Sequence, residues 1–189
     1  MTVKANERQT NSTNVSEIKT TGILTEEGIS ITEKSKVDAL SQRGYGRSEN
    51  YMLTLAFYEA LYLLDKELLE VKDEKGEEVD FQSLLHYFEK ANENAWVKYL
   101  VYRDLRSRGY VVREGFGPRT DFRAYDRGAY GKDTAAYMVL STQEGKPLPI
   151  GDLELSLRHC QSEKKELTLA VMNRRGEIVY YSVSQLTFK

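Results

Sequence analysis

Three observations on the sequence predict an α/β (α+β) fold with two subdomains. The chain has 189 residues, which is enough for two small domains that share an interface. Segments with apolar residues at three- and four-residue steps alternate with short runs rich in Val, Ile, Leu and Tyr. Apolar residues make up 40% of the chain and charged residues 30%, as in a soluble globular protein. We expect a small sheet-and-helix subdomain over residues 17–90 and a mixed sheet packed on helices over 91–189.

The N-terminal part begins with residues 1–16, which have few apolar side chains and no periodicity, so we expect a disordered tail. Two β-like runs within 17–32 flank the turn Glu26-Glu27-Gly28 and predict a hairpin. Asp80 has the position of an N-cap for a helix that follows it. The other elements expected here are helices over 33–43, 56–66 and 81–90 and strands over 52–55 and 68–71.

The C-terminal part opens with a helix from Trp96 that Gly109 ends, since glycine commonly follows a helix terminus. Short strands are expected after it, at 110–112, 121–125 and 135–140. A loop with two prolines then leads to a helix from Asp152 to about 164. Two last strands, 167–172 and 177–183, are joined by the turn 173–176.

Composition excludes several kinds of site. Cys160 is the single cysteine, so neither a disulfide framework nor a cysteine-built metal site is expected. The two histidines, His86 and His159, are far apart in sequence, and we expect no metal and no cofactor. No apolar run reaches about 18 residues and the N-terminus lacks a signal-peptide core, so we expect a cytoplasmic protein with no membrane segment.

Charge is unevenly distributed along the chain. Residues 98–132 contain nine Lys or Arg and four Asp or Glu, a balance of +5, whereas the whole chain has a net charge of −2. A local basic face on an acidic protein is what phosphate binding requires. An ordinary salt-bridged surface would have the same composition.

Two long motifs identify a family. The stretch YLVYRDLRSRGYVV, followed by GFGPRTDFRAYDRG, closely resembles the archaeal tRNA-intron (tRNA-splicing) endonuclease family, whose hallmark reads YLVYRDLR-x-RGYVVK and then GF-x-x-G-x-DFRVY-x-RG. EALYLLDK and LTLAVMNRRGEIVYYSV match further elements, so the resemblance covers roughly Val37 to the C-terminus. It implies the family's nuclease-type C-terminal domain.

The resemblance also implies a reaction. The family cleaves precursor tRNA at bulge-helix-bulge intron boundaries without metal: a 2′-hydroxyl attacks the adjacent phosphate and leaves a 2′,3′-cyclic phosphate and a 5′-hydroxyl. A tyrosine, a histidine and a lysine carry out this chemistry. Their positions here are Tyr125, Thr134 and Lys165, so the triad lacks its histidine. Threonine does not exchange protons near neutral pH and cannot replace the general acid.

Four cationic residues are candidates for RNA binding. Arg158 matches an arginine that the family uses to hold a flipped-out base, seven residues before Lys165. If the helix continued to Lys165, both could face one substrate. The other candidates are Lys164, Arg123 and Arg119.

A full-length member with an incomplete triad fits the structural subunit of a heterotetrameric enzyme, inactive alone and paired with a catalytic paralogue, two copies of each. The alternatives are an active subunit that uses a substitute acid, for which His159 is the nearby choice, and an RNA-binding scaffold of the same fold. The last strand, 178–183, is expected at the subunit edge. The family's acidic hairpin loop is largely basic here. The interface residues expected are Arg174, Arg175, Glu177, Tyr180 and Tyr181.

Overall fold

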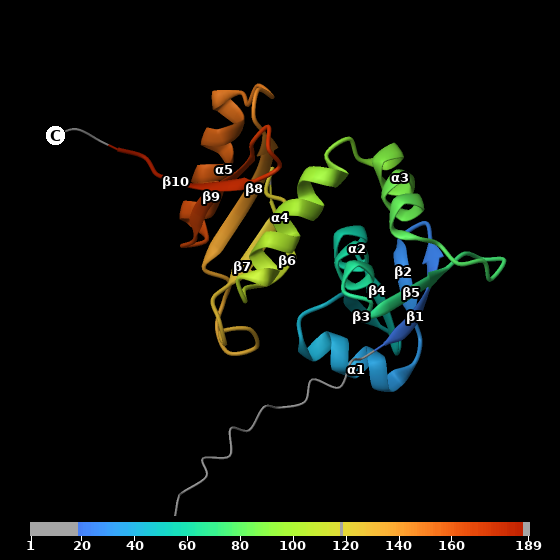
Figure 1. Cartoon of the computed structure of the whole chain (residues 1–189). Helices are drawn as coiled ribbons and strands as arrows, with labels where there is room; N and C mark the ends of the chain where they lie inside the picture. The colour runs from blue at the N-terminus through green and yellow to red at the C-terminus, as the bar shows by residue number, and fades with distance from the viewer. Residues whose placement is uncertain (1–18, 118, 187–189) are drawn as a thin grey trace, which may run out of the picture.

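The computed structural model describes residues 19–117 and 119–186, and it confirms the α/β fold class. The tail expected over residues 1–16 lies outside the described residues. Two five-stranded sheets stand on either side of a central helix (Figure 1). Among the described residues, no helix is both long and apolar enough to cross a membrane.

The N-terminal sheet has the strand order β3-β4-β2-β1-β5, in which only β1 and β5 are parallel. Its strands are β1 (Thr20–Thr25), β2 (Gly28–Ile31), β3 (Arg47–Glu49), β4 (Met52–Leu55) and β5 (Leu69–Lys72). The helices of this half are α1 (Lys34–Gln42), α2 (Phe57–Asp65) and α3 (Phe81–Ala91). Asp80 caps α3 as predicted, since its Oδ1 accepts a hydrogen bond from the Ser83 amide.

The C-terminal sheet has the order β10-β9-β8-β7-β6, and its single parallel pair is β8 with β9. The elements are α4 (Ala95–Ser107), β6 (Val111–Glu114), β7 (Phe122–Tyr125), β8 (Tyr137–Gln143), α5 (Ile150–Ser162), β9 (Glu166–Met172) and β10 (Ile178–Val183). A parallel pair needs a crossover, which α5 provides. Helix α4 lies on one face of the sheet, between it and α2 and α3, while α5 packs on the other face.

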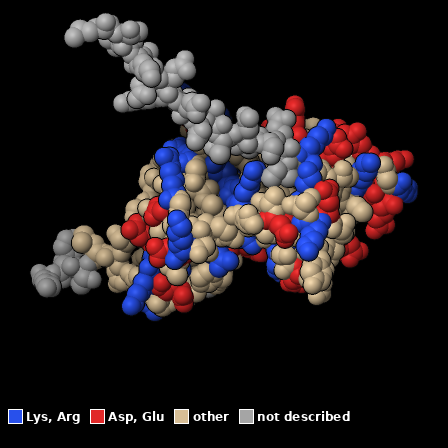
Figure 2. All heavy atoms as spheres, turned by 90° about the horizontal axis from the view of Figure 1, so that it is seen from below, with Lys and Arg blue, Asp and Glu red and all other residues tan. Residues whose placement is uncertain are grey.

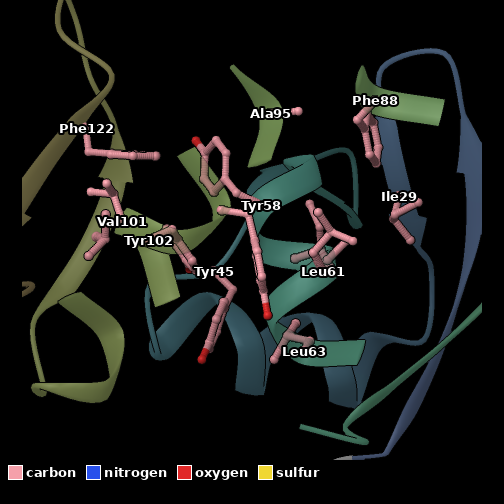
Figure 3. Packing of buried hydrophobic residues seen from close by; sticks show 14 of the residues in the cluster. Ile29, Tyr45, Tyr58, Leu61, Leu63, Phe88, Ala95, Val101, Tyr102 and Phe122 are labelled. Atoms are coloured by element: carbon pink, nitrogen blue, oxygen red, sulfur yellow. The ribbon is translucent and has the colours of Figure 1, made fainter. Parts of the chain in front are cut away.

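One hydrophobic core joins the two halves. Tyr58 of α2 packs its ring 4.9 Å from the ring of Tyr102 on α4 and 4.9 Å from that of Phe122 on β7. Figure 3 shows these rings in a cluster that continues to Leu61 and Ile29. Because the rings of α2 and β7 touch, the relative position of the halves is fixed by buried contacts.

A buried carboxylate reinforces this interface. Glu59 is 3% exposed and accepts hydrogen bonds from the amides of Gly46 and Ala56, at 3.1 and 2.9 Å. The guanidinium of Arg113 on β6 lies 3.6 Å away and donates to the carbonyl oxygen of Gly44 at 3.0 Å. Burial raises the pKa of the Glu59 carboxyl, against the opposing effect of Arg113.

The ends of four helices share one geometry, the Schellman motif, in which two backbone amides after the helix donate back to its last turn. Gly44 and Gly109 occupy the left-handed position after α1 and α4, whereas Glu67 and Lys164 occupy it after α2 and α5. The helix expected to reach about residue 164 therefore ends at Ser162, because Lys164 has a φ of 55° and the Lys165 amide donates to the Cys160 carbonyl. The prediction was also wrong at 47–49, which forms the short strand β3 rather than part of a turn.

Candidate active site and RNA-binding surface

The two residues predicted from the motifs to be catalytic, Tyr125 and Lys165, lie at one end of the C-terminal sheet, where β7, β8 and β9 are adjacent. The registers of these strands align Tyr125, Ala136 and Lys165 in one row, directly beyond the paired row of Ala124, Tyr137 and Glu166. Neighbouring strands are 4.7–4.9 Å apart, so the Cα atoms of Tyr125 and Lys165 are about 10 Å from each other. By strand alternation, both side chains project on the face that α5 covers.

Tyr125 is half-buried and is oriented by a second tyrosine. Its ring meets that of Tyr130 edge to face, with centroids 5.1 Å apart and an interplanar angle of 89°. Tyr130 in turn packs against Gly44, where an added Cβ would lie 3.3 Å from the Tyr130 ring and 2.4 Å from Val111 Cγ1. The loop 126–136 is thereby positioned by a glycine of the N-terminal half.

Lys165 is half-buried and its ammonium group is already engaged. Its Nζ donates a 2.8 Å hydrogen bond to the backbone carbonyl oxygen of Ala135, one residue after Thr134. This bond ties the start of β9 to the segment that precedes β8. A lysine held in this way stabilises the sheet end and has one donor fewer for a phosphate.

Thr134, at which motif spacing predicts the family's histidine, is exposed in the loop before β8, beside exposed Asp133. The alternative acid, His159, lies on α5, where its Nε2 is 3.2 Å from the Phe116 carbonyl oxygen and its ring meets the Phe116 ring edge to face. A Cβ on Gly117 would lie 2.2 Å from this Nε2, so the loop after β6 covers the nitrogen. The ring of His159 is thus engaged by Phe116 and Gly117 of the loop after β6.

The RNA-binding candidates separate into two pairs. Arg158 and Lys164 are exposed near the end of α5, although Arg158 forms an ion pair with Glu154 on the same helix. Arg119 forms a 2.8 Å ion pair with Asp152, and the half-buried Arg123 stacks its guanidinium 5.4 Å from the Phe116 ring centroid. The first pair is accessible to a ligand, whereas Arg119 joins the loop after β6 to α5 and Arg123 contacts that loop from β7.

The candidate interface residues lie on β10 and its hairpin. Strand β10 is a sheet edge, and on it Tyr181 is 53% exposed. Tyr180 points the other way: its hydroxyl donates to Asp104 on α4 at 2.8 Å, and burial together with this bond raises its pKa. In the turn, the Arg174 amide donates to Glu144 at 3.1 Å, and the remaining two, Arg175 and Glu177, are exposed.

Two residues support this site without having been assigned a role from the motifs, although Glu59 is the first residue of the matched motif EALYLLDK. Tyr130 orients Tyr125, and its only signal in the sequence is a lone aromatic residue in the glycine-bearing loop 126–131. Glu59 secures the interface between the halves, and its signal is a carboxylate inside an otherwise apolar helical run, at the third position after Ala56. That spacing is typical of a helix-capping glutamate.

Charge is unevenly distributed on the face of the molecule that Figure 2 shows. Figure 2 shows Asp and Glu crowded at the end formed by the N-terminal sheet, whereas Lys and Arg lie over the middle and the C-terminal half. This distribution agrees with the basic balance of residues 98–132. Within the described part of the chain, no group of three or more His, Cys, Asp or Glu side chains could hold a metal ion.

Comparison with known proteins assigns the family. Residues 95–180 match the family described as tRNA intron endonuclease, catalytic C-terminal domain, and residues 20–85 match its N-terminal domain, so the likeness begins before Val37. The chain is 33% identical over 163 residues to a tRNA-splicing endonuclease of Methanococcus vannielii, covering 86% of the chain and 92% of that protein. It is 36% identical over 147 residues to one of Pyrococcus furiosus, covering 77% of the chain and 84% of that protein. The family expected from the motifs is confirmed: this chain belongs to the tRNA intron endonuclease family.

Proposed function

We propose that this chain is the structural subunit of a tRNA-splicing endonuclease that cleaves precursor tRNA at bulge-helix-bulge intron boundaries. The observation that carries the proposal is the state of its own site. Motif spacing predicts Thr134 at the general-acid position, and the ammonium of Lys165 is bound to the Ala135 carbonyl. Loss of a general acid alone lowers a rate on the order of 10²–10⁴-fold.

The reaction belongs to the complex. A catalytic paralogue with the complete tyrosine, histidine and lysine set would direct a 2′-hydroxyl against the adjacent phosphate without metal, leaving a 2′,3′-cyclic phosphate and a 5′-hydroxyl. This chain would contribute a folded subunit with the edge strand β10 for assembly and the accessible cations Arg158 and Lys164 for RNA binding. Two copies of each chain would form the heterotetramer.

Activity measurements test this assignment. The purified chain should not cut a bulge-helix-bulge precursor at a useful rate, and mixing with the paralogue of the same organism should give cleavage. Tyr125→Phe in this chain keeps the ring contact with Tyr130, so the rate of the mixture should stay unchanged. Robust metal-independent cleavage by the chain alone, lost on Tyr125→Phe, would instead identify an active subunit with a substitute acid.

Partner choice is tested at the hairpin. Two copies of a basic loop repel at close range, whereas a basic and an acidic loop attract. Arg175 is the better position for a test, because Arg174 lies 3.6 Å from Glu144 of its own chain. Arg175→Asp should shift the balance from the paralogue toward self-association, as native mass measurement would show. No shift would mean that partner choice is made elsewhere.

A further inference from the structure

A cavity lies on the face of the C-terminal sheet opposite to Tyr125 and Lys165. It has a volume of about 250 Å³ and opens between the end of α4 and the sheet. We call it the tyrosine pocket. Its walls are Arg108, Tyr110, Tyr137 and Tyr180, and Ala124 and Val139 are among the residues that line it.

The walls are held rigid by contacts that leave the cavity open. The rings of Tyr110 and Tyr137 meet edge to face at 6.2 Å and 85°. On the other side the Tyr180 hydroxyl donates to Asp104, and the guanidinium of Arg108 lies 5.6 Å from the Tyr180 ring centroid while its Nε donates to Asp104 at 2.7 Å. Such flat, preorganised surfaces suit a planar ligand.

The position of the tyrosine pocket connects it to the candidate site. Tyr137 is the residue after Ala136, which lies in the row between Tyr125 and Lys165. Successive residues of a strand face opposite sides, so the pocket and the site share one end of the sheet and are separated by its thickness.

The charged groups around the tyrosine pocket have both signs: Arg108 is paired with Asp104, Asp126 and Glu166 lie near Tyr137, and Arg127 is a cation without such a pair among the described residues. Arg127 is exposed, donates its Nε to the Arg108 carbonyl at 2.8 Å, and forms no ion pair with the residues that the structure describes. Its guanidinium lies beside a pocket wall, and its remaining N–H groups are available to a phosphate. Asp126 raises the pKa of Tyr137, whose neutral hydroxyl can donate a hydrogen bond.

We propose that the tyrosine pocket binds one unpaired RNA base by stacking against Tyr110 or Tyr137, with Arg127 at the adjoining phosphate. The proposal rests on the proposed function, since it assigns part of the substrate RNA to this chain. A cavity of this size is below the usual range for whole small-molecule ligands and suits a single heterocycle. Stacking on an aromatic ring accepts any base and contributes about 1–3 kcal/mol for each base.

The test uses the complex of the full chain with its catalytic paralogue and two RNAs. One is a bulge-helix-bulge RNA with 2-aminopurine in a bulge, and the other is the same strand fully paired. Tyr110→Leu keeps an apolar side chain but removes the flat ring, so the Kd for the bulged RNA should rise about tenfold with no change for the paired RNA. Tyr110→Phe should bind like the unchanged chain.

A second variant and a control guard against a folding defect. Thr168→Phe places a bulky side chain in the cavity without removing a tyrosine, and it should also weaken only the bulged RNA and alter the 2-aminopurine fluorescence. Tyr87→Leu, at a tyrosine that is 40% exposed on α3, should change neither affinity. Thermal melting should show that all variants fold.

Each contrary result has a definite meaning. If Tyr110→Leu and Thr168→Phe both bind the bulged RNA within twofold of the unchanged chain, or if they weaken both RNAs equally, the tyrosine pocket does not bind a base. Loss of paralogue capture with unchanged RNA affinity would show that a partner side chain fills it. If the unchanged complex does not prefer the bulged RNA, the proposed function itself fails.

Discussion

The Nζ atom of Lys165 donates a 2.8 Å hydrogen bond to the backbone carbonyl oxygen of Ala135. The bond closes the end of the sheet where β8 and β9 start, directly beside Thr134. A residue that the motifs predict to be catalytic thus has a structural contact in this chain, and the contact can be measured separately from any cleavage activity.

Lys165→Ala should lower the free energy of unfolding by about 1 kcal/mol, because a hydrogen bond from a charged donor contributes roughly 1.5–3 kcal/mol when buried and less at a half-buried site. Lys164→Ala is the matched control, since Lys164 is exposed and should change stability little. Urea unfolding at neutral pH measures both variants. Equal effects would show that the Lys165 ammonium is not used for stability.

Thr134→His should raise precursor cleavage by the isolated chain less than about tenfold, well below the 10²–10⁴-fold that a general acid supplies in a prepared site. The reason is that Lys165 remains bound to Ala135 and Arg158 to Glu154. Thr134→Gln, which adds bulk without an exchangeable proton, is the control. A gain of several hundredfold over that control would mean that the acid was the only defect.

Lys164→Gly should stabilise the chain by about 0.5–1 kcal/mol. A non-glycine residue in the left-handed region costs roughly 1–2 kcal/mol, and removal of this cost is partly offset because glycine raises the conformational entropy of the unfolded chain. Glu67→Gly, at the equivalent position after α2, should give a similar gain. The midpoints of urea unfolding compare the two. RNA affinity should fall with the Lys164 variant alone, because only that variant removes a cation.

Glu59→Gln should change the pH dependence of stability. Burial raises the folded-state pKa of Glu59 above 4.5, so the folded chain binds the proton more tightly than the unfolded chain. This contribution is fully present below the unfolded-state pKa and is lost as pH rises through the folded-state value. The unfolding free energy of the unchanged chain minus that of the variant should therefore decrease above about pH 4.5.

That difference is measured by urea unfolding at a series of pH values. Glu114→Gln is the control, because Glu114 on β6 is an exposed carboxylate that lines a surface cleft together with Glu59. A difference that is constant with pH, or that increases, would contradict a raised pKa. It would show that the ion pair with Arg113, rather than desolvation, dominates at this site.

Much of the fold could be predicted because local signals agree with it. Gly109 and Asp80 mark helix ends in the sequence, and the predicted helices and strands are confirmed with small shifts at their termini. Lys164 could not be recognised as a helix stop, because lysine rarely occupies a left-handed position. Its conformation follows from the tertiary course of the chain into β9.

The candidate site was only partly accessible to sequence reasoning. Motif spacing named Tyr125, Thr134 and Lys165, but it contains no information on hydrogen bonds, so the engagement of Lys165 could not be foreseen. The contact of Tyr130 with Gly44 joins residues 86 positions apart in the chain. Contacts of this kind depend on how the halves pack, which short sequence patterns do not specify.

The shared core has a consequence for how the chain loses its structure. Although the sequence matches two separate domain families, the rings of Tyr58, Tyr102 and Phe122 touch across the boundary between residues 85 and 95. Either half alone would expose part of an aromatic surface to water. The two inherited modules therefore form one cooperative unit, so heat or denaturant should melt both sheets in a single transition.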